Sequence, residues 1–144
     1  MGHTELIVTP EQKALVQQTF TQVLPIADQA AALFYNRLFQ LDPSLRPLFK
    51  SDLKDQGKKL MQMIGYCVSK LNTVDEIVPA VKELGRLHAG YGVKDDAYET
   101  VGAALLWTLE RGLGPHFTPD VKAAWTAVYA VLAGTMQAGA AHAN

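Results

Sequence analysis

Of the residues in this chain that could do chemistry, His88 stands in the most distinctive pattern. It follows Ile77, Val81 and Leu84 at intervals of four, three and four residues, so its imidazole should point the same way as the apolar stripe of a helix. A neutral imidazole in such a place is either a packed core or cap residue or a metal ligand, and spacing alone leaves both open. The other three histidines lie near the chain ends or in a Gly-Pro loop, where we expect surface or turn positions: His3, His142 and His116.

Common enzyme and cofactor motifs are missing from the sequence. It contains no phosphate-binding P-loop, no G-x-G-x-x-G fingerprint and no H-E-x-x-H or paired Glu-x-x-His motif. Cys67 is the only cysteine, which excludes an intramolecular disulfide and a multi-cysteine metal site. With 13 basic and 14 acidic residues spread along the chain, we expect neither a nucleic-acid partner nor a polybasic membrane contact.

Length and composition predict one globular domain. The 144 residues, 49% of them hydrophobic, suit a single domain over 1–144 with a core from about 9 to 138 and frayed ends. The first residues do not resemble a signal peptide, and no apolar run reaches the ~18–20 residues that a bilayer crossing needs. We therefore expect a cytoplasmic protein, and the short charged loops favour a monomer.

Apolar spacing predicts an all-α fold of about six substantial helices joined by short connections. Helix openings are expected at a capping box, at prolines and at Asp-containing turns: Thr9–Gln12, Pro25, Asp42-Pro43, Thr73–Glu76, Asp95-Asp96 and Thr118–Asp120. The polar stretch from Lys50 to Lys59 should lead into a long helix, and Gly139 to Asn144 should fray. The apolar stripes predict a core that includes Leu15, Val16, Phe20, Val23, Leu24, Phe34, Leu38, Leu60, Cys67, Val68, Leu105, Leu109, Val121, Trp125 and Val128.

Four segments together resemble the globin family, above all neuroglobins, bacterial single-domain globins and the globin part of flavohaemoglobins. They occur in the globin order and cover the chain from about Thr9 to Met136: Phe34–Phe39 (FYNRLF), Leu41–Phe49 (LDPSLRPLF), Leu84–Val93 (LGRLHAGYGV) and Leu113–Pro119 (LGPHFTP) with Ala123-Ala124-Trp125. The resemblance implies a globin fold of six to eight helices around a pocket for haem b.

The resemblance also implies roles for single residues. His88 would bind the haem iron, Phe49 would stack on the haem, and Tyr35 would reach the distal face. Gln56 and Leu60 would line that face from one side of a helix, since they are four residues apart.

Further residues are implied to contact the cofactor. The carbonyl of Leu84, one turn before His88, would accept a hydrogen bond from the free ring nitrogen. Phe34 would pack at the pocket, and Tyr98 matches a tyrosine that supports the proximal histidine in flavohaemoglobins. Lys59, beside Lys58, would either meet a haem propionate or remain solvated.

Three functions remain open on this basis. The first is reversible binding of O2, CO or NO, with Tyr35 and Gln56 as donors to the bound ligand, for oxygen storage, transport or scavenging. The second is nitric oxide detoxification, in which O2 and NO give nitrate and a separate reductase supplies electrons. The third is a haem-free or redox-sensing regulatory domain, which would leave Tyr35, Phe49, Gln56 and His88 placed by coincidence.

Two departures from relatives shape these expectations. Gln56 stands where many globins have a distal histidine, so we do not expect a bis-histidine haem. Ala140 stands where flavohaemoglobins have a glutamate behind the proximal histidine. The resulting anionic push on the iron should be weaker than in flavohaemoglobins, which argues against peroxidase-like activity.

Overall fold

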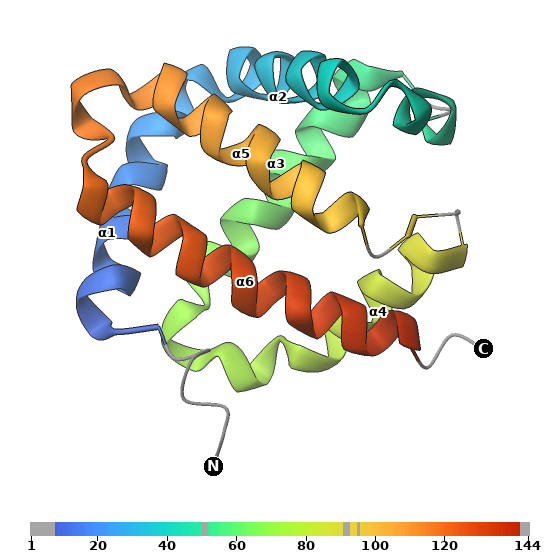
Figure 1. Cartoon of the computed structure of the whole chain (residues 1–144). Helices are drawn as coiled ribbons and strands as arrows, with labels where there is room; N and C mark the ends of the chain where they lie inside the picture. Colours follow the sequence, from blue (N-terminus) through green and yellow to red (C-terminus); the bar gives the residue numbers. More distant parts are fainter. Residues whose placement is uncertain (1–7, 50–51, 91–92, 95, 142–144) are drawn as a thin grey trace.

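The computed structural model describes residues 8–49, 52–90, 93–94 and 96–141, and the regular elements within these ranges are all helices (Figure 1). Six α-helices alternate with short 3-10 helices: α1 (Pro10–Val23), η2 (Leu24–Ile26), α2 (Ala27–Leu41), η3 (Pro43–Leu48), α3 (Leu53–Ser69), η4 (Leu71–Glu76), α4 (Val78–Gly90), α5 (Ala97–Leu113), η5 (Gly114–His116) and α6 (Pro119–Ala141). The prediction of an all-α fold is confirmed.

Three of the predicted helix openings are confirmed by their hydrogen bonds. Thr9 and Gln12 form a reciprocal capping box, in which the Thr9 hydroxyl accepts from the Gln12 amide at 3.1 Å. The Asp42 carboxylate accepts from the Ser44 amide at 3.1 Å and so opens η3. The Thr118 hydroxyl accepts from the Val121 amide at 3.2 Å at the start of α6.

The predicted capping box at Thr73–Glu76 is wrong. Those residues belong to the 3-10 helix η4, Thr73 has the non-helical angles φ −136° and ψ 48°, and α4 begins only at Val78. A helix that started at Thr73 would place Pro79 in its interior, where a proline removes one hydrogen bond and clashes with the preceding turn. Starting at Val78 instead leaves Pro79 in the first turn, where a proline is tolerated.

Other boundaries also differ from the prediction. Pro25 lies in the 3-10 turn η2, and α2 begins two residues later. Leu24, which was predicted to belong to the core, is 51% exposed and lies just after α1 as the first residue of η2. The polar stretch before Leu60 is mostly helical, since α3 already begins at Leu53 behind an Asp52 cap.

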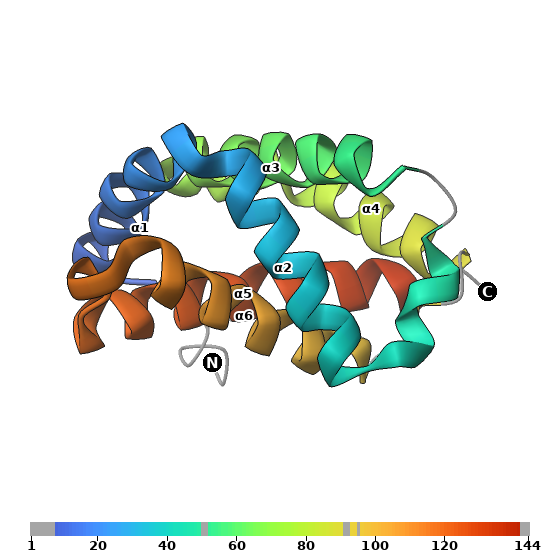
Figure 2. The ribbon, with the colours of Figure 1, turned by 90° about the horizontal axis from the view of Figure 1, so that it is seen from above.

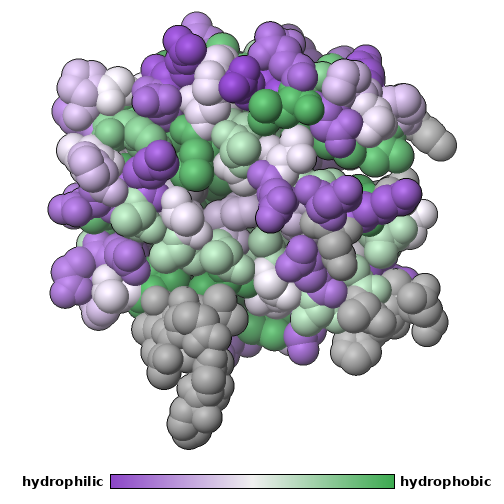
Figure 3. Space-filling model, viewed as in Figure 1, coloured by the Kyte–Doolittle hydropathy of each residue, from purple (hydrophilic) through white to green (hydrophobic). Residues whose placement is uncertain are grey.

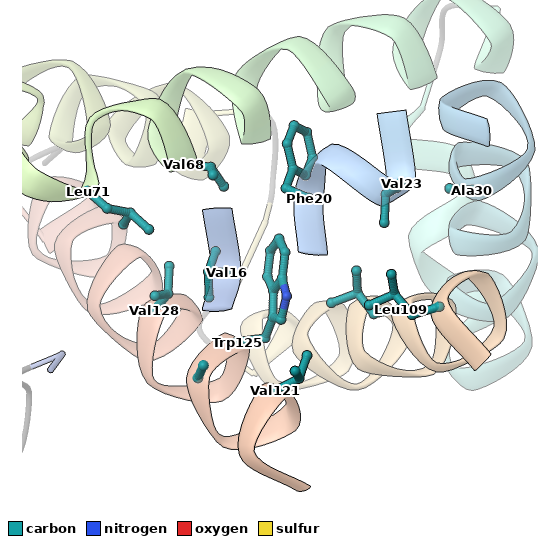
Figure 4. Packing of buried hydrophobic residues seen from close by; sticks show 12 residues of the cluster. Val16, Phe20, Val23, Ala30, Val68, Leu71, Leu109, Val121, Trp125 and Val128 are labelled. Carbon is teal, nitrogen blue, oxygen red and sulfur yellow. The ribbon is translucent and has the colours of Figure 1, made fainter. Parts of the chain in front are cut away.

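The main core lies between α1, α3, α5 and α6 (Figure 4). Trp125, which is 2% exposed, is at its centre, and its indole N–H donates to the Thr19 hydroxyl at 2.9 Å. The ring of Phe20 packs against the indole with the ring centroids 6.4 Å apart. Because the one polar atom of the indole has a partner, a very large apolar side chain can be buried here without an unsatisfied donor.

Helix α2 links the two sides of the molecule. It crosses obliquely, as Figure 2 shows, and packs against both α3 and α5. Among the described residues, α3 and α4 have few contacts with each other or with α5; α3 and α5 pack mainly against α2, and α4 packs mainly against α6.

The surface carries no dominant apolar region on the face seen in Figure 3, where hydrophilic and hydrophobic residues are interspersed. The large apolar side chains that are exposed are spread over several elements: Leu24, Leu41, Met63, Tyr66 and Leu87. None of the described helices combines the length and apolar character that a membrane crossing requires.

Candidate functional site

His88 lies in the last turn of α4, half-buried, with its ring held in one orientation. Its Nδ1 is 2.7 Å from the carbonyl oxygen of Leu84, one helical turn earlier, which confirms the predicted hydrogen bond. A carbonyl only accepts, so Nδ1 carries the proton and Nε2 of the neutral ring keeps its lone pair. No described residue forms a hydrogen bond with Nε2. The ring therefore presents an oriented, unprotonated nitrogen that suits a metal.

Tyr35 lies on α2 and is buried among aromatic rings. Its ring meets Phe34 edge-on at 5.2 Å and Phe49 at 5.3 Å between centroids, and it stacks on Phe39 at 6.1 Å. Burial raises the pKa of Tyr35 to about 12, so the hydroxyl stays protonated at neutral pH and can donate a hydrogen bond. No other described residue serves as its hydrogen-bond partner.

Gln56 and Leu60 lie one turn apart on α3, and both are half-buried. The neighbouring Gly57 is buried where α3 crosses α2, and a Cβ at this glycine would lie 2.8 Å from Ala31 Cβ and 3.9 Å from the Tyr35 ring. This close crossing brings the α3 backbone at Gly57, next to Gln56 in the chain, beside the ring of Tyr35. The two predicted distal donors thus come from adjacent helices at one crossing point.

Around Tyr35 lie apolar side chains that the rest of the protein covers only in part. Eight of them pack against the buried cluster of Tyr35 and Leu38 while remaining half-buried: Phe39, Leu48, Phe49, Leu53, Leu60, Val93, Val101 and Leu105. On α4, Leu84 is half-buried and Leu87 is 39% exposed. Partly covered apolar side chains on α3, α4 and α5, with a free imidazole nitrogen on α4, fit a large flat apolar group such as haem.

The remaining predicted site residues have more ordinary surroundings. Phe34 is a buried residue of α2. Tyr98 is buried on α5, and its carbonyl accepts a hydrogen bond from the Tyr129 hydroxyl at 2.6 Å. Lys59 is exposed on α3 and forms no ion pair with any residue that the structure describes.

Sequence reasoning missed a small internal cavity. It has a volume of about 20 Å³, comparable to the space of a single water, and apolar residues line nearly all of it. Phe34, Leu60 and Trp125 are among the lining residues. A cavity of this size is a shortfall in packing between helices, and no sequence pattern signals it.

Comparison with known protein families identifies the family of this chain. The globin family model matches residues 32–136, which run from within α2 to near the end of α6 and carry all the site residues above. The chain therefore belongs to the globin family, and the predicted globin fold is confirmed. Membership implies a haem-binding globin whose ligands are small diatomic molecules.

Individual relatives narrow the comparison. The chain is 26% identical to neuroglobin of Danio rerio over 92% of both proteins, and 30% identical to neuroglobin of Tetraodon nigroviridis over 74% of this chain and 76% of the relative. It is 33% identical to the flavohemoprotein of Bacillus subtilis (strain 168) over 69% of this chain, which spans only 26% of that longer protein. The match to the flavohemoprotein thus concerns about a quarter of its length.

Proposed function

We propose that this chain is a haem b globin that reversibly binds O2, and also CO and NO, with His88 as the iron ligand and Tyr35 and Gln56 as donors to the bound ligand. When bound, the haem supplies a ferrous iron that takes up a diatomic molecule. The observation that carries the proposal is the His88 ring, which has Nδ1 bonded to Leu84 and Nε2 without a partner. The proposal rests as well on membership of the globin family.

The Leu84–His88 hydrogen bond has two effects on the imidazole. It fixes the proton on Nδ1, so that Nε2 is the nitrogen that can bind iron, and it restrains rotation of the ring. An N–H that donates to a carbonyl also makes the opposite nitrogen a stronger base. Both effects favour a stable bond between His88 and a metal.

Tyr35 acts as a hydrogen-bond donor through its hydroxyl proton. Because burial raises its pKa to about 12, the hydroxyl remains a donor over the whole physiological pH range. The rings of Phe34, Phe39 and Phe49 surround the Tyr35 ring, and a hydrogen bond in such an apolar setting is electrostatically stronger than one in water. The Gln56 amide supplies a second donor from α3.

We expect Tyr35→Phe to raise the O2 dissociation rate. A hydrogen bond to a charged acceptor contributes ~1.5–3 kcal/mol, so its loss should accelerate release by roughly ten- to one-hundredfold. Stopped-flow displacement of O2 by CO measures this rate. CO accepts hydrogen bonds weakly, so its own dissociation rate should change much less.

Tyr66→Phe is the matched control, because Tyr66 is 49% exposed on the outer side of α3. It should leave both rates unchanged. Gln56→Leu should raise the O2 rate in the same direction as Tyr35→Phe. If Tyr35→Phe and Gln56→Leu both released O2 at the rate of the unmodified protein, the assignment of these donors would be wrong.

The second candidate is a nitric oxide dioxygenase, which converts O2 and NO to nitrate. The similarity to a flavohemoprotein and the protonated Tyr35 hydroxyl favour it, since the same donors would hold O2 for this reaction. Each turnover leaves the iron oxidised, so the reaction requires a reductase as electron donor. Rapid nitrate formation sustained by an added reductase would support this activity, and re-reduction that stays slow with every donor would favour the ligand carrier.

A further inference from the structure

Helices α4 and α6 approach each other so closely that only glycine fits at two positions. A Cβ at Gly85 on α4 would lie 1.9 Å from the carbonyl oxygen of Met136 on α6. A Cβ at Gly139 on α6 would lie 1.9 Å from the carbonyl oxygen of Lys82 on α4. The contact is reciprocal, because each helix sets a buried glycine against a carbonyl of the other (α4 and α6 in Figure 1).

This contact directly precedes the candidate iron ligand. Gly85 follows Leu84, whose carbonyl orients His88, and lies three residues before His88 itself. The Leu84 carbonyl and the His88 ring are parts of one rigid helix, so a displacement of α4 moves both together. The separation of α4 from α6 therefore sets where Nε2 stands.

Helix α6 is the main support of α4. Side chains reinforce the glycine contact, because the buried Ile77 and Val81 pack with Leu132 and Met136 of α6. Contacts from α4 to the other described helices are few. No other described helix packs against α4 to a comparable extent.

We infer that Gly85 and Gly139 are positioning residues for His88, which fix its distance from the distal donors on α2 and α3. The inference rests on the proposed role of His88 as the iron ligand. A Cβ needs at least 3.0 Å of clearance, so an alanine at either position forces the helices apart by about 1 Å. A misplacement of this size is known to cost as much as 10²-fold at a reacting centre.

The chain offers matched controls on the same two helices. No described residue has an atom within 4 Å of a Cβ placed at Gly90 on α4 or at Gly134 on α6. Gly90→Ala and Gly134→Ala therefore make the same chemical change without moving the helices. Val16→Ala, in the core on α1, weakens the fold at a distance from α4 and so controls for general destabilisation.

The test compares the haem-loaded proteins by two measurements other than activity. Resonance Raman spectra of the ferrous, ligand-free proteins give the iron–histidine stretching frequency, and transfer to a haem-scavenging apoprotein gives the hemin dissociation rate. We expect Gly85→Ala and Gly139→Ala to shift the stretching band and to accelerate hemin loss by roughly ten- to one-hundredfold. Gly90→Ala, Gly134→Ala and Val16→Ala should keep the original band.

A second variant covers the case in which the alanine variants do not fold. A chain that ends at Ala138 lacks Gly139 and so removes one of the two contacts without adding any atom. It should show a band shift and faster hemin loss than the full chain. An unshifted band and an unchanged rate in this variant and in any folded alanine variant, or an equal shift in Val16→Ala, would overturn the inference.

The same experiment separates this inference from the proposed function. If the unmodified protein takes up no hemin, the proposed function fails and the role of the glycines toward His88 fails with it. If the unmodified protein binds hemin through a histidine and the Gly85 and Gly139 variants behave like it, the proposed function stands and the inference alone is wrong.

Discussion

Replacement of His88 by alanine should remove the haem from the purified protein. The imidazole of His88 is oriented by the hydrogen bond at Nδ1, and its Nε2 has no hydrogen-bond partner among the described residues. Loss of a direct metal ligand should weaken binding by more than the ~10–100-fold that loss of a neighbouring support costs. Titration of the apoprotein with hemin, followed by Soret absorbance, measures the effect.

His116→Ala is the control for this variant, because His116 is exposed in η5 and far along the chain from the candidate site. It should bind hemin as the unmodified protein does. His88→Gly with added imidazole provides a further check, since the free ligand should restore a histidine-like spectrum. Unchanged colour and haem content in His88→Ala would show that another residue binds the iron.

Replacement of Trp125 by alanine should cause the largest loss of stability from a single change. Truncation of a fully buried tryptophan typically costs ~3–5 kcal/mol. Here it also removes the packing against Phe20 and leaves the Thr19 hydroxyl without its indole donor. Urea unfolding of the apoprotein, followed by far-UV circular dichroism, should show a lower midpoint urea concentration, in proportion to this loss of unfolding free energy.

Trp107 supplies the comparison within the same chain. It is half-buried, with the guanidinium carbons of Arg37 and Arg111 at 5.2 and 4.7 Å from its ring centroid. Such partly exposed cation–π contacts contribute about 0.5–1 kcal/mol each, so Trp107→Ala should cost clearly less than Trp125→Ala. Equal losses from the two variants would contradict the central place of Trp125 in the core.

The predicted helices were reliable where local chemistry decides the structure. Thr9, Asp42 and Thr118 cap because their side-chain oxygens reach backbone amides within a few residues. The failures occurred where distant contacts decide. Thr73 follows a capping pattern but lies in a 3-10 turn, and Gly139, predicted to fray, is buried because the α4 backbone packs directly against it.

The features of the candidate site were likewise predictable where they depend on one helix, and not where they depend on contacts between helices. The hydrogen bond from His88 to Leu84 follows from a spacing of one helical turn and was predictable. The half-buried face shared by Gln56 and Leu60 was predictable for the same reason. The close approach of Gly57 to Ala31, and of Gly85 to Met136, joins residues from separate helices, and a single sequence contains no pattern that reveals such pairs.

We expect this globin to carry haem whose iron has a free coordination position for a diatomic ligand. The most direct test is the visible spectrum of the purified protein in the ferric state and after reduction with dithionite, with and without CO. We expect a strong Soret band in both states and a clear shift of the reduced band when CO is added. A colourless protein that also fails to take up added hemin would contradict this expectation.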